Sequence, residues 1–383
     1  CQRGTPECIC GRPMTQGFVP PPYPYDRLDK FKPLANKFEG GLVDLSIGTP
    51  CDAPTPEIIA ALSTSNSERG YPPSIGSDAL RKAAQDWMQR KFEISVPTSQ
   101  IAACIGSKEF VATTAQYMKL RTPDRDVVLF PAVSYPTYEM GAILAGCRPV
   151  AVPMTPTGGL DLSKISDADI KRALMIWSNS PNNPTGALDD LAALAAWGRK
   201  NVVPVFSDEC YVEFTWARQP ESILQYGLDG VVALHSLSKR SNLAGLRVGF
   251  YAGDEELVNY LKEVRKHVGM IVPGPAQSAA VVALNDDAHV AAQRDVYRHR
   301  LEKMASVLTK WSGFDIQLPS GGFYLWFDAN DGWAFAERLA REGGALVSPG
   351  DFYGSGGANN VRVAVVQPDD KIELVAERLG RNK

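Results

Sequence analysis

Residues 236–250 read Ser-Leu-Ser-Lys-Arg-Ser-Asn-Leu-Ala-Gly-Leu-Arg-Val-Gly-Phe and follow closely on the apolar run Val-Val-Ala-Leu at 231–234. The apolar run predicts a buried strand, and the polar turn after it presents Lys239. Burial lowers the pKa of a lysine from its ordinary value of about 10.4, which frees a nucleophilic amine for imine formation. The neighbouring hydroxyls and Arg247 can hold a phosphate, the arginine as a bidentate fork.

An imine-forming amine beside a phosphate cradle indicates pyridoxal phosphate (PLP) as the cofactor. Ser236, Ser238 and Arg247 would form one wall of the cradle. The other wall is expected where the strand at 101–105 runs into a helix, because free amides and the helix dipole attract anions there. That wall consists of the residues at the helix start: Gly106, Ser107 and Lys108. A solvated lysine and arginine on an ordinary turn is the alternative, and the complete Gly-x-Arg-x-Gly string disfavours it.

A second buried strand, at 202–206, ends in Ser-Asp-Glu-Cys-Tyr. A buried Asp208 is costly unless it is paired, and the pyridinium nitrogen of the cofactor would pair it. A carboxylate there keeps that nitrogen protonated and strengthens the ring as an electron sink. Glu209 is the competing acid, but adjacent side chains on a strand point to opposite faces.

Strands and helices alternate from about residue 100 to 250, which predicts an α/β fold with a mostly parallel sheet. The candidate cofactor residues fall at or just beyond strand ends, where such sheets bind ligands. The chain start and the C-terminal third would build a smaller α+β domain. The expected division is a tag or upstream leader at 1–13, an arm and part of the small domain at 14–56, a large PLP-binding domain at 57–275, and a small C-terminal domain at 276–383.

Composition narrows the class of protein. The 383 residues are 44% hydrophobic and 22% charged with a formal net charge of -3, so no basic surface favours nucleic acid or an anionic membrane. No apolar stretch reaches the length of a membrane span, and no signal peptide is visible. Seven scattered cysteines are not a disulfide framework and favour a reduced, cytoplasmic protein. Cys8 and Cys10 lack zinc-ligand spacing, so no metal site is expected.

The string from Ser236 to Gly249 resembles the lysine motif of the class I/II aminotransferases, which are fold-type I PLP enzymes, and the resemblance extends over most of the chain from about Tyr25. It implies that the backbone amide of Gly48 meets the substrate carboxylate. It implies that Tyr71 reaches across a dimer to the cofactor phosphate. It also implies that an aromatic ring stacks on the pyridine ring, with Tyr135 preferred and Tyr138 as the competing candidate.

The same resemblance assigns three further residues. Residues 178–186, Ser-Asn-Ser-Pro-Asn-Asn-Pro-Thr-Gly, are similar to the family's Asn-Pro-x-Asn-Pro-Thr-Gly segment, with Ser180 as a difference. Asn183 would donate to the phenolic oxygen of PLP, and Tyr211 would share that oxygen. Arg362, in Arg-Val-Ala, would clamp the substrate α-carboxylate. The proline-rich arm at 20–25 would cross onto a partner subunit, giving a homodimer with shared sites.

The expected activity is therefore ping-pong transamination, with Lys239, Asp208 and Tyr211 as the catalytic set. The strings at 207–211, 233–239, 265–273 and 349–354 together are similar to the actinobacterial type of succinyldiaminopimelate aminotransferases. That resemblance implies lysine and diaminopimelate biosynthesis, with glutamate as donor and N-succinyl-2-amino-6-oxopimelate as acceptor. Arg265 and Lys266 are the candidates for its distal carboxylates.

Two alternative functions remain open at this stage, and a third is disfavoured. An aminotransferase with aspartate-like or broad specificity would share every class motif. A PLP β-lyase would share every cofactor residue. A PLP-sensing regulator would need a DNA-binding domain, for which the sequence before Val43 leaves no room.

Overall fold

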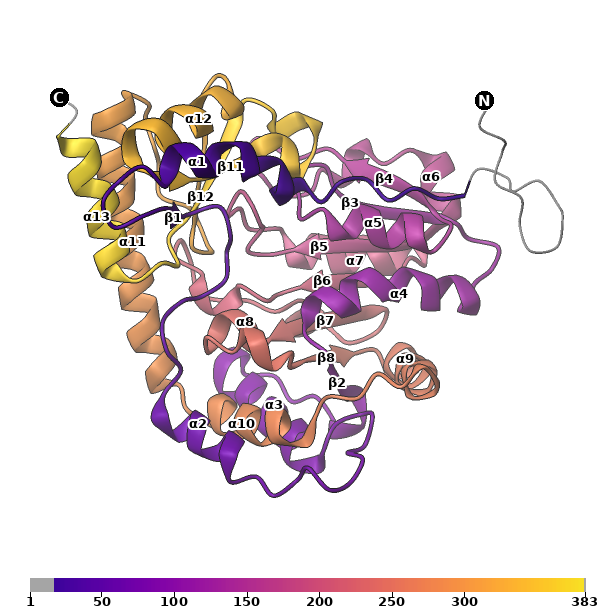
Figure 1. Cartoon of the computed structure of the whole chain (residues 1–383). Coiled ribbons are helices and arrows are strands. Elements are labelled where there is room, and N and C mark those ends of the chain that lie inside the picture. Colours follow the sequence, from indigo (N-terminus) through magenta and orange to yellow (C-terminus); the bar gives the residue numbers. More distant parts are fainter. Residues whose placement is uncertain (1–16, 382–383) are drawn as a thin grey trace, which may run out of the picture.

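The computed structural model describes residues 17–381, so the expected leader at 1–13 lies outside the described residues. A seven-stranded sheet forms the centre of the described chain (Figure 1). Its spatial order is β2 (Ile101–Cys104), β8 (Gly249–Gly253), β7 (Val231–Ser236), β6 (Val205–Asp208), β5 (Ala173–Asn179), β3 (Val127–Pro131) and β4 (Arg148–Val152).

The sheet is mostly parallel, as the sequence predicts. Strands β4, β3, β5, β6 and β7 pair in parallel, and only β8 runs against its two neighbours. Every residue of β5, β6 and β7 is buried. Continuous burial requires cover on both faces of the sheet, which is typical of parallel sheets in α/β proteins.

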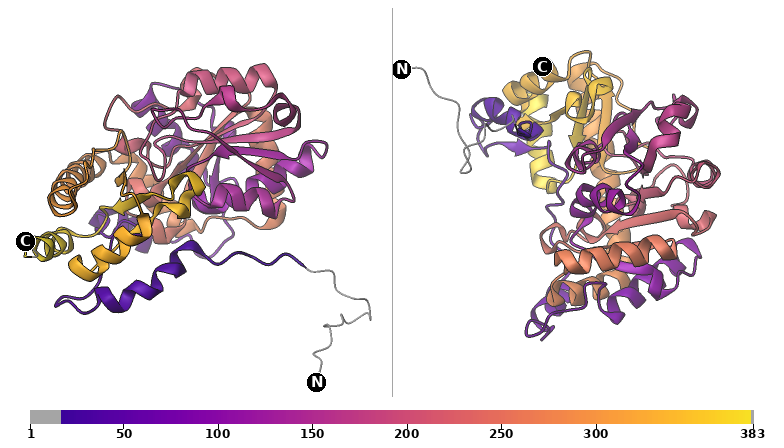
Figure 2. Two further views of the ribbon diagram at one scale, coloured as in Figure 1. Left: turned by 90° about the horizontal axis from the view of Figure 1, so that it is seen from above. Right: turned by 90° about the vertical axis from the view of Figure 1, so that its right-hand side faces the viewer.

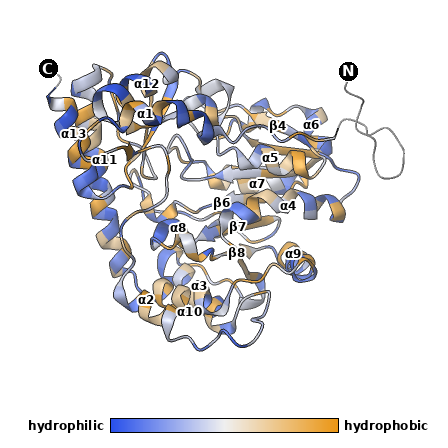
Figure 3. Cartoon of the chain, in the orientation of Figure 1, coloured by the Kyte–Doolittle hydropathy of each residue, from blue (hydrophilic) through white to orange (hydrophobic). Residues whose placement is uncertain are grey.

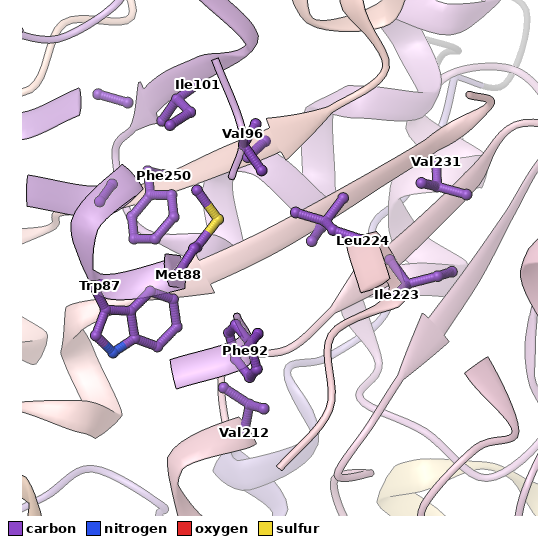
Figure 4. Packing of buried hydrophobic residues seen from close by; sticks show 14 of the residues in the cluster. Trp87, Met88, Phe92, Val96, Ile101, Val212, Ile223, Leu224, Val231 and Phe250 are labelled. Atoms are coloured by element: carbon purple, nitrogen blue, oxygen red, sulfur yellow. The ribbon is translucent and has the colours of Figure 1, made fainter. Parts of the chain in front are cut away.

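Helices cover the two faces of the sheet (Figure 2). Alternate side chains serve opposite faces: Val231 and Ala233 pack in one apolar cluster, while Val232 and Leu234 pack in the other. Figure 4 shows the first cluster, where Trp87 and neighbouring side chains of one helix lie against the strands. The helices on that side are α2 (Pro56–Ser63), α3 (Asp78–Phe92), α7 (Leu191–Asn201) and α10 (Gly274–Asn285), and those on the other are α4 (Ser107–Arg121), α5 (Thr137–Leu144) and α9 (Glu255–Val268).

A third apolar cluster belongs to the C-terminal region and the chain start. Its three-stranded antiparallel sheet has the order β11 (Ser348–Pro349), β12 (Asn360–Ala364) and β9 (Tyr324–Asp328), and β1 (Val43–Asp44) pairs in parallel with β10 (Ala345–Leu346). Figure 3 colours its long helix α11 in alternating hydrophilic and hydrophobic bands, as expected of a helix with one face on the core. The helices of this region are α1 (Lys32–Ala35), α11 (Ala288–Ser312), α12 (Gly332–Gly343) and α13 (Asp369–Gly380).

The remaining elements are short. Two are α-helical, α6 (Asp167–Arg172) and α8 (Leu237–Arg240). The 3₁₀ helices are η1 (Pro24–Phe31), η2 (Thr98–Gln100), η3 (Leu162–Lys164), η4 (Val212–Phe214), η5 (Ile223–Tyr226), η6 (Ala244–Leu246), η7 (Gly350–Tyr353) and η8 (Ser355–Gly357). Between residues 17 and 381, no helix is long and apolar enough to cross a membrane.

The packing of α10 differs from the expected start of the small domain at residue 276. Ala276 and Ala280 of this helix lie in the cluster of α2 and α3, not in the C-terminal cluster. The apolar face of α10 therefore belongs with the large domain, and α11 is the first long helix of the C-terminal cluster. The hydropathy pattern could not predict this packing of α10, because an apolar helix face does not itself show which part of the protein it packs against.

Candidate active site

A cavity of about 600 Å³ opens at the edge of the sheet where the parallel strands end. The segments after β2, β3, β5, β6 and β7 contribute to it, together with the chain start and the C-terminal region. It collects most of the side chains that the sequence singles out. Its predicted site residues are Gly48, Ser107, Lys108, Tyr135, Asn183, Asp208, Tyr211, Ser238, Lys239, Arg247 and Arg362.

Lys239 lies in the short helix α8, directly after β7, and its ammonium Nζ donates to the backbone carbonyl of Gly48. Burial lowers the pKa of Lys239 to about 8, and the positive charges of Arg362 and Arg247 act in the same direction. A larger fraction of this amine is therefore unprotonated near neutral pH than for an ordinary lysine, and that fraction is available as a nucleophile.

The residues expected to form the phosphate cradle come together at the N-terminus of α4. Gly106 is its N-cap residue with a φ of 74°, and a Cβ at this position would overlap the Arg247 guanidinium. Arg247 donates to the carbonyl of Ala244 at 2.9 Å, and Ser107 and Ser238 line the same cavity. Gly106 therefore contributes by allowing close approach of an arginine to a helix N-terminus, an arrangement that binds anions.

Ser236 lies slightly deeper than predicted. Its hydroxyl caps α8 by accepting the Ser238 amide at 3.2 Å, and it lines a small second cavity behind the first one. The structure thus places Ser238 on the main cavity and Ser236 behind it.

Asp208 and Glu209 point to opposite sides of β6, as strand alternation requires. Asp208 lines the main cavity, accepting from the Tyr138 hydroxyl at 3.0 Å and the Cys210 amide at 3.1 Å. The pKa of Asp208 is raised because burial outweighs the lowering effect of these two hydrogen bonds. Glu209 lines the second cavity, accepts from Ser207 at 2.9 Å, and has a pKa raised to about 7 by burial.

Tyr135 and Tyr138, the two candidates for stacking on the pyridine ring, have different surroundings in the structure. Tyr138 is buried and holds the carboxylate of Asp208. Tyr135 lines the cavity with the Lys108 ammonium 5.9 Å from its ring centroid. Because the Tyr138 hydroxyl is engaged by Asp208, Tyr135 remains the candidate for stacking on a bound ring.

Arg362 is buried against the side of the cavity, where its guanidinium donates to the Asn183 side-chain oxygen at 2.8 Å and to the backbone carbonyl of Ser46. Its Nε is buried and has no hydrogen-bond partner among the described residues. The pKa of Arg362 is raised, although burial opposes this, because four tyrosines surround it. A buried cation with a donor left over is suited to a carboxylate ligand.

The described chain does not bring Tyr71 to the cavity. Its side chain is 97% exposed, and its expected role needs a partner subunit. The interpretation of Arg265 is contradicted: this arginine is buried in a bidentate ion pair with Glu109, with both N–O distances 2.7 Å. Lys266 is exposed beside Glu263 and does not line the cavity.

Three tyrosines on the cavity were missed by the sequence reasoning. Tyr23 accepts from the Lys108 ammonium at 3.2 Å, and Tyr25 accepts from Arg362 at 3.3 Å. Tyr324 is buried, and its hydroxyl lies 2.9 Å from that of Tyr211. The repeated tyrosines of the proline-rich arm were a visible signal for the first two, whereas Tyr324 resembles any core residue of a strand.

The family model described as aminotransferase class I and II matches residues 41–379. The chain belongs to the class I/II aminotransferases. It is 39% identical over 94% of its length to the 4-dedimethylamino-4-oxo-anhydrotetracycline transaminase OxyQ of Streptomyces rimosus, covering 99% of that protein. It is 36% identical over 95% of its length to the LL-diaminopimelate aminotransferase of Aquifex aeolicus, covering 97% of it.

The fold of this aminotransferase also matches solved structures. One is described as a "probable N-succinyldiaminopimelate aminotransferase" from Thermus thermophilus, with a TM-score of 0.83 and 29% identity. The match covers 94% of the present chain and 100% of that one. The fold is therefore that of the fold-type I PLP enzymes.

PLP is the cofactor of this family, and the cavity fits it. A nucleophilic amine, a helix N-terminus beside an arginine, a buried carboxylate and a tyrosine ring would suit different parts of PLP: its aldehyde, phosphate, ring nitrogen and ring face. Within residues 17–381, no three His, Cys, Asp or Glu side chains gather in a way that could hold a metal ion.

The lowered pKa of Lys239 predicts how the apoenzyme takes up PLP. The amine is mostly protonated below its pKa of about 8 and mostly free above it, so the rate of PLP attachment should rise with pH and level off above about 8. Stopped-flow absorbance after mixing apoenzyme with PLP measures this rate. A rate that keeps rising up to about pH 10.4, the ordinary lysine pKa, would show that burial does not shift Lys239.

Proposed function

We propose that this aminotransferase transfers an amino group from glutamate to N-succinyl-2-amino-6-oxopimelate in diaminopimelate and lysine biosynthesis. The observation that carries the proposal is the placement of two further cations on the cavity, besides Lys239 and Arg247. Arg362 is buried within it, whereas Lys108, which the sequence placed in the phosphate cradle, is exposed at its rim and is proposed here to meet the substrate instead. Lys108 has no carboxylate partner within 4 Å among residues 17–381, and only the Tyr23 hydroxyl accepts from its ammonium.

The chain's own residues supply the binding and the proton transfer. Bound PLP supplies the electron sink that stabilises negative charge at the substrate Cα. Arg362 would bind the α-carboxylate, and the free amine of Lys239 would take the proton from that Cα and return it. Asp208 would hold the ring nitrogen, with its carboxylate kept in place by Tyr138. Asn183 and Tyr211 would hold the phenolic oxygen.

The charge of the substrate favours the succinylated compound over free diaminopimelate. Succinylation converts the distal ammonium of diaminopimelate into a neutral amide and adds a carboxylate. The free compound would bring a cation toward Lys108, whereas the succinylated one would bring an additional anion. The resemblance of four sequence strings and the similarity to the Thermus thermophilus structure support the same assignment.

An LL-diaminopimelate aminotransferase is the second candidate, because the Aquifex aeolicus relative of that name is 36% identical to the chain. The two candidates differ by one succinyl group, which makes a matched assay possible. N-succinyl-LL-diaminopimelate, LL-diaminopimelate and aspartate are compared as amino donors, with 2-oxoglutarate as acceptor.

We expect kcat/KM to be at least about ten-fold higher for the succinylated donor, because each well-placed polar contact discriminates by roughly that factor. Faster turnover of LL-diaminopimelate or aspartate would overturn the substrate assignment and leave the aminotransferase intact. Faster amination of 4-dedimethylamino-4-oxo-anhydrotetracycline would favour the activity for which OxyQ is named. A separate assay with a β-thioether amino acid tests for a β-lyase, which would release a thiol, pyruvate and ammonia without consuming 2-oxoglutarate.

Replacement of Lys108 by methionine tests the rim cation directly. Because Lys108 is exposed, the variant should fold, and KM for N-succinyl-LL-diaminopimelate should rise about ten-fold with kcat largely retained. Lys266→Met removes another exposed lysine, away from the cavity, and should leave both constants unchanged. An unchanged KM in Lys108→Met would show that the distal carboxylates bind elsewhere.

The homodimer with shared sites and the cytoplasmic location remain predictions. The exposed ring of Tyr71 and the exposed residues 20–23 of the proline-rich arm favour a partner subunit, since both belong to the segments expected to reach across to it.

A further inference from the structure

Tyr324 touches three parts of the active site at once. It lies on β9 and is 1% exposed. Its ring faces Arg362, whose guanidinium carbon lies 4.2 Å from the ring centroid. Its hydroxyl lies 2.9 Å from the hydroxyl of Tyr211. A Cβ on Gly48 would overlap that hydroxyl and lie 2.7 Å from the ring carbon Cζ, so Gly48 also packs directly on this ring.

These contacts join groups from separate segments. Tyr211 follows β6 in the large domain, whereas Arg362 comes from β12 of the C-terminal sheet. Gly48 lies in the N-terminal segment, and its carbonyl accepts a hydrogen bond from the ammonium of Lys239. No hydrogen bond in the described chain joins the side chains of Tyr211 and Arg362 directly, whereas Tyr324 contacts both of them.

We propose that Tyr324 is a positioning residue that couples the cofactor end of the cavity to its carboxylate end, acting through Tyr211 at one and Arg362 at the other. The inference rests on the proposed roles of those two residues. It assigns separate tasks to the two parts of one side chain: the hydroxyl orients Tyr211, and the ring supports the guanidinium plane of Arg362.

The role of the Tyr324 hydroxyl follows from the number of hydroxyl protons that the two tyrosines can donate. Each tyrosine has one hydroxyl proton, so when Tyr211 donates its proton to an oxygen in the cavity, Tyr324 must be the donor between the two. Donation to the Tyr211 oxygen makes Tyr211 a stronger donor in turn, because linked hydrogen bonds polarise one another. Loss of the Tyr324 hydroxyl should therefore weaken the stabilisation of negative charge on the oxygen that Tyr211 contacts.

The ring task follows from burial. Arg362 has a buried Nε without a partner among the described residues, so hydrogen bonds alone do not fix its plane. The rings of Tyr324 and Tyr353 both lie within 4.8 Å of its guanidinium carbon. A desolvated arginine gains substantially from such contacts, and a shorter aliphatic side chain at position 324 would remove one of them.

The test uses PLP-loaded enzyme and two measurements other than turnover. The first is the midpoint of a pH titration followed by the visible absorbance of the loaded enzyme. The second is the Kd of glutarate, an unreactive dicarboxylate. Tyr324→Phe should raise the midpoint by about 0.5 pH unit and change the Kd less than about two-fold. Tyr324→Leu should also raise the Kd about ten-fold.

A double-mutant cycle with Tyr211→Phe identifies the route. Tyr324→Phe should shift the midpoint in the wild-type background and cause no further shift in Tyr211→Phe. Tyr353→Phe is the matched control: its ring also contacts Arg362, but its hydroxyl bonds to Tyr25, so the midpoint should stay unchanged.

Equal shifts in both backgrounds, or no shift in Tyr324→Phe, would overturn the proposal. An unchanged midpoint in Tyr211→Phe would overturn it together with the role of Tyr211. The substrate assignment is measured with different donors and is unaffected by either outcome.

Discussion

Lys239→Ala should lower kcat by about 10⁴-fold or more, because we propose that this amine is both the nucleophile toward the cofactor and the base at the substrate Cα. No other lysine replaces it: of the lysines in the described chain only Lys108 also lines the cavity, and that one is exposed at the rim. The variant should also lose protein-bound visible absorbance after dialysis. Steady-state assay and absorbance spectra of the purified variant measure both effects.

The variant Lys239→Arg tests whether the positive charge of this side chain or its free amine is required for activity. Arginine keeps the positive charge but cannot be deprotonated in a protein, so it should be as inactive as alanine. Lys108→Met is the control for loss of a lysine from the same cavity and should retain the visible absorbance. Turnover and absorbance near wild-type levels in either Lys239 variant would contradict the assignment of this lysine.

Asp208→Asn should lower kcat by on the order of 10²–10³-fold, because it removes a fixed negative charge from the buried end of the cavity. Glu209→Gln should change kcat by no more than a few-fold. Its side chain faces the second cavity, and burial has already raised its pKa to about 7, so a neutral amide resembles the form that it often takes. The comparison requires both variants to be folded and loaded with PLP.

Circular dichroism and bound-PLP content establish that condition before the rates are compared. Comparable losses of kcat in the two variants would contradict the assignment of Asp208 as the acid that faces the ring. A large loss in Glu209→Gln alone would assign the role to the acid on the opposite side of β6.

The local sequence pattern was sufficient to predict two groups of the site, because each of them lies at the end of a strand. Lys239 and Asp208 each follow an uninterrupted apolar run, and parallel strands that alternate with helices bring such ends to one edge of a sheet. The choice of Asp208 over Glu209 also needed only the two-residue period of a strand. Asn183 and Arg362 came instead from the resemblance to the family, since a turn asparagine or a strand arginine has no local mark of function.

Partners distant in sequence could not be predicted in this way. Arg265 looked like a free cation near the site, but a carboxylate 156 residues away, on Glu109, neutralises it. Tyr324 looked like a core residue, yet its hydroxyl meets Tyr211 across 113 residues.

The sequence by itself therefore determined the parallel α/β sheet, the lysine and the acid, because the period of a strand and the position of its end are local properties. Only the tertiary structure decided which cations stay free for a substrate and which tyrosine links Tyr211 to Arg362. Whether a buried charge is available depends on the group packed against it, and chain folding selects that group without regard to distance along the sequence.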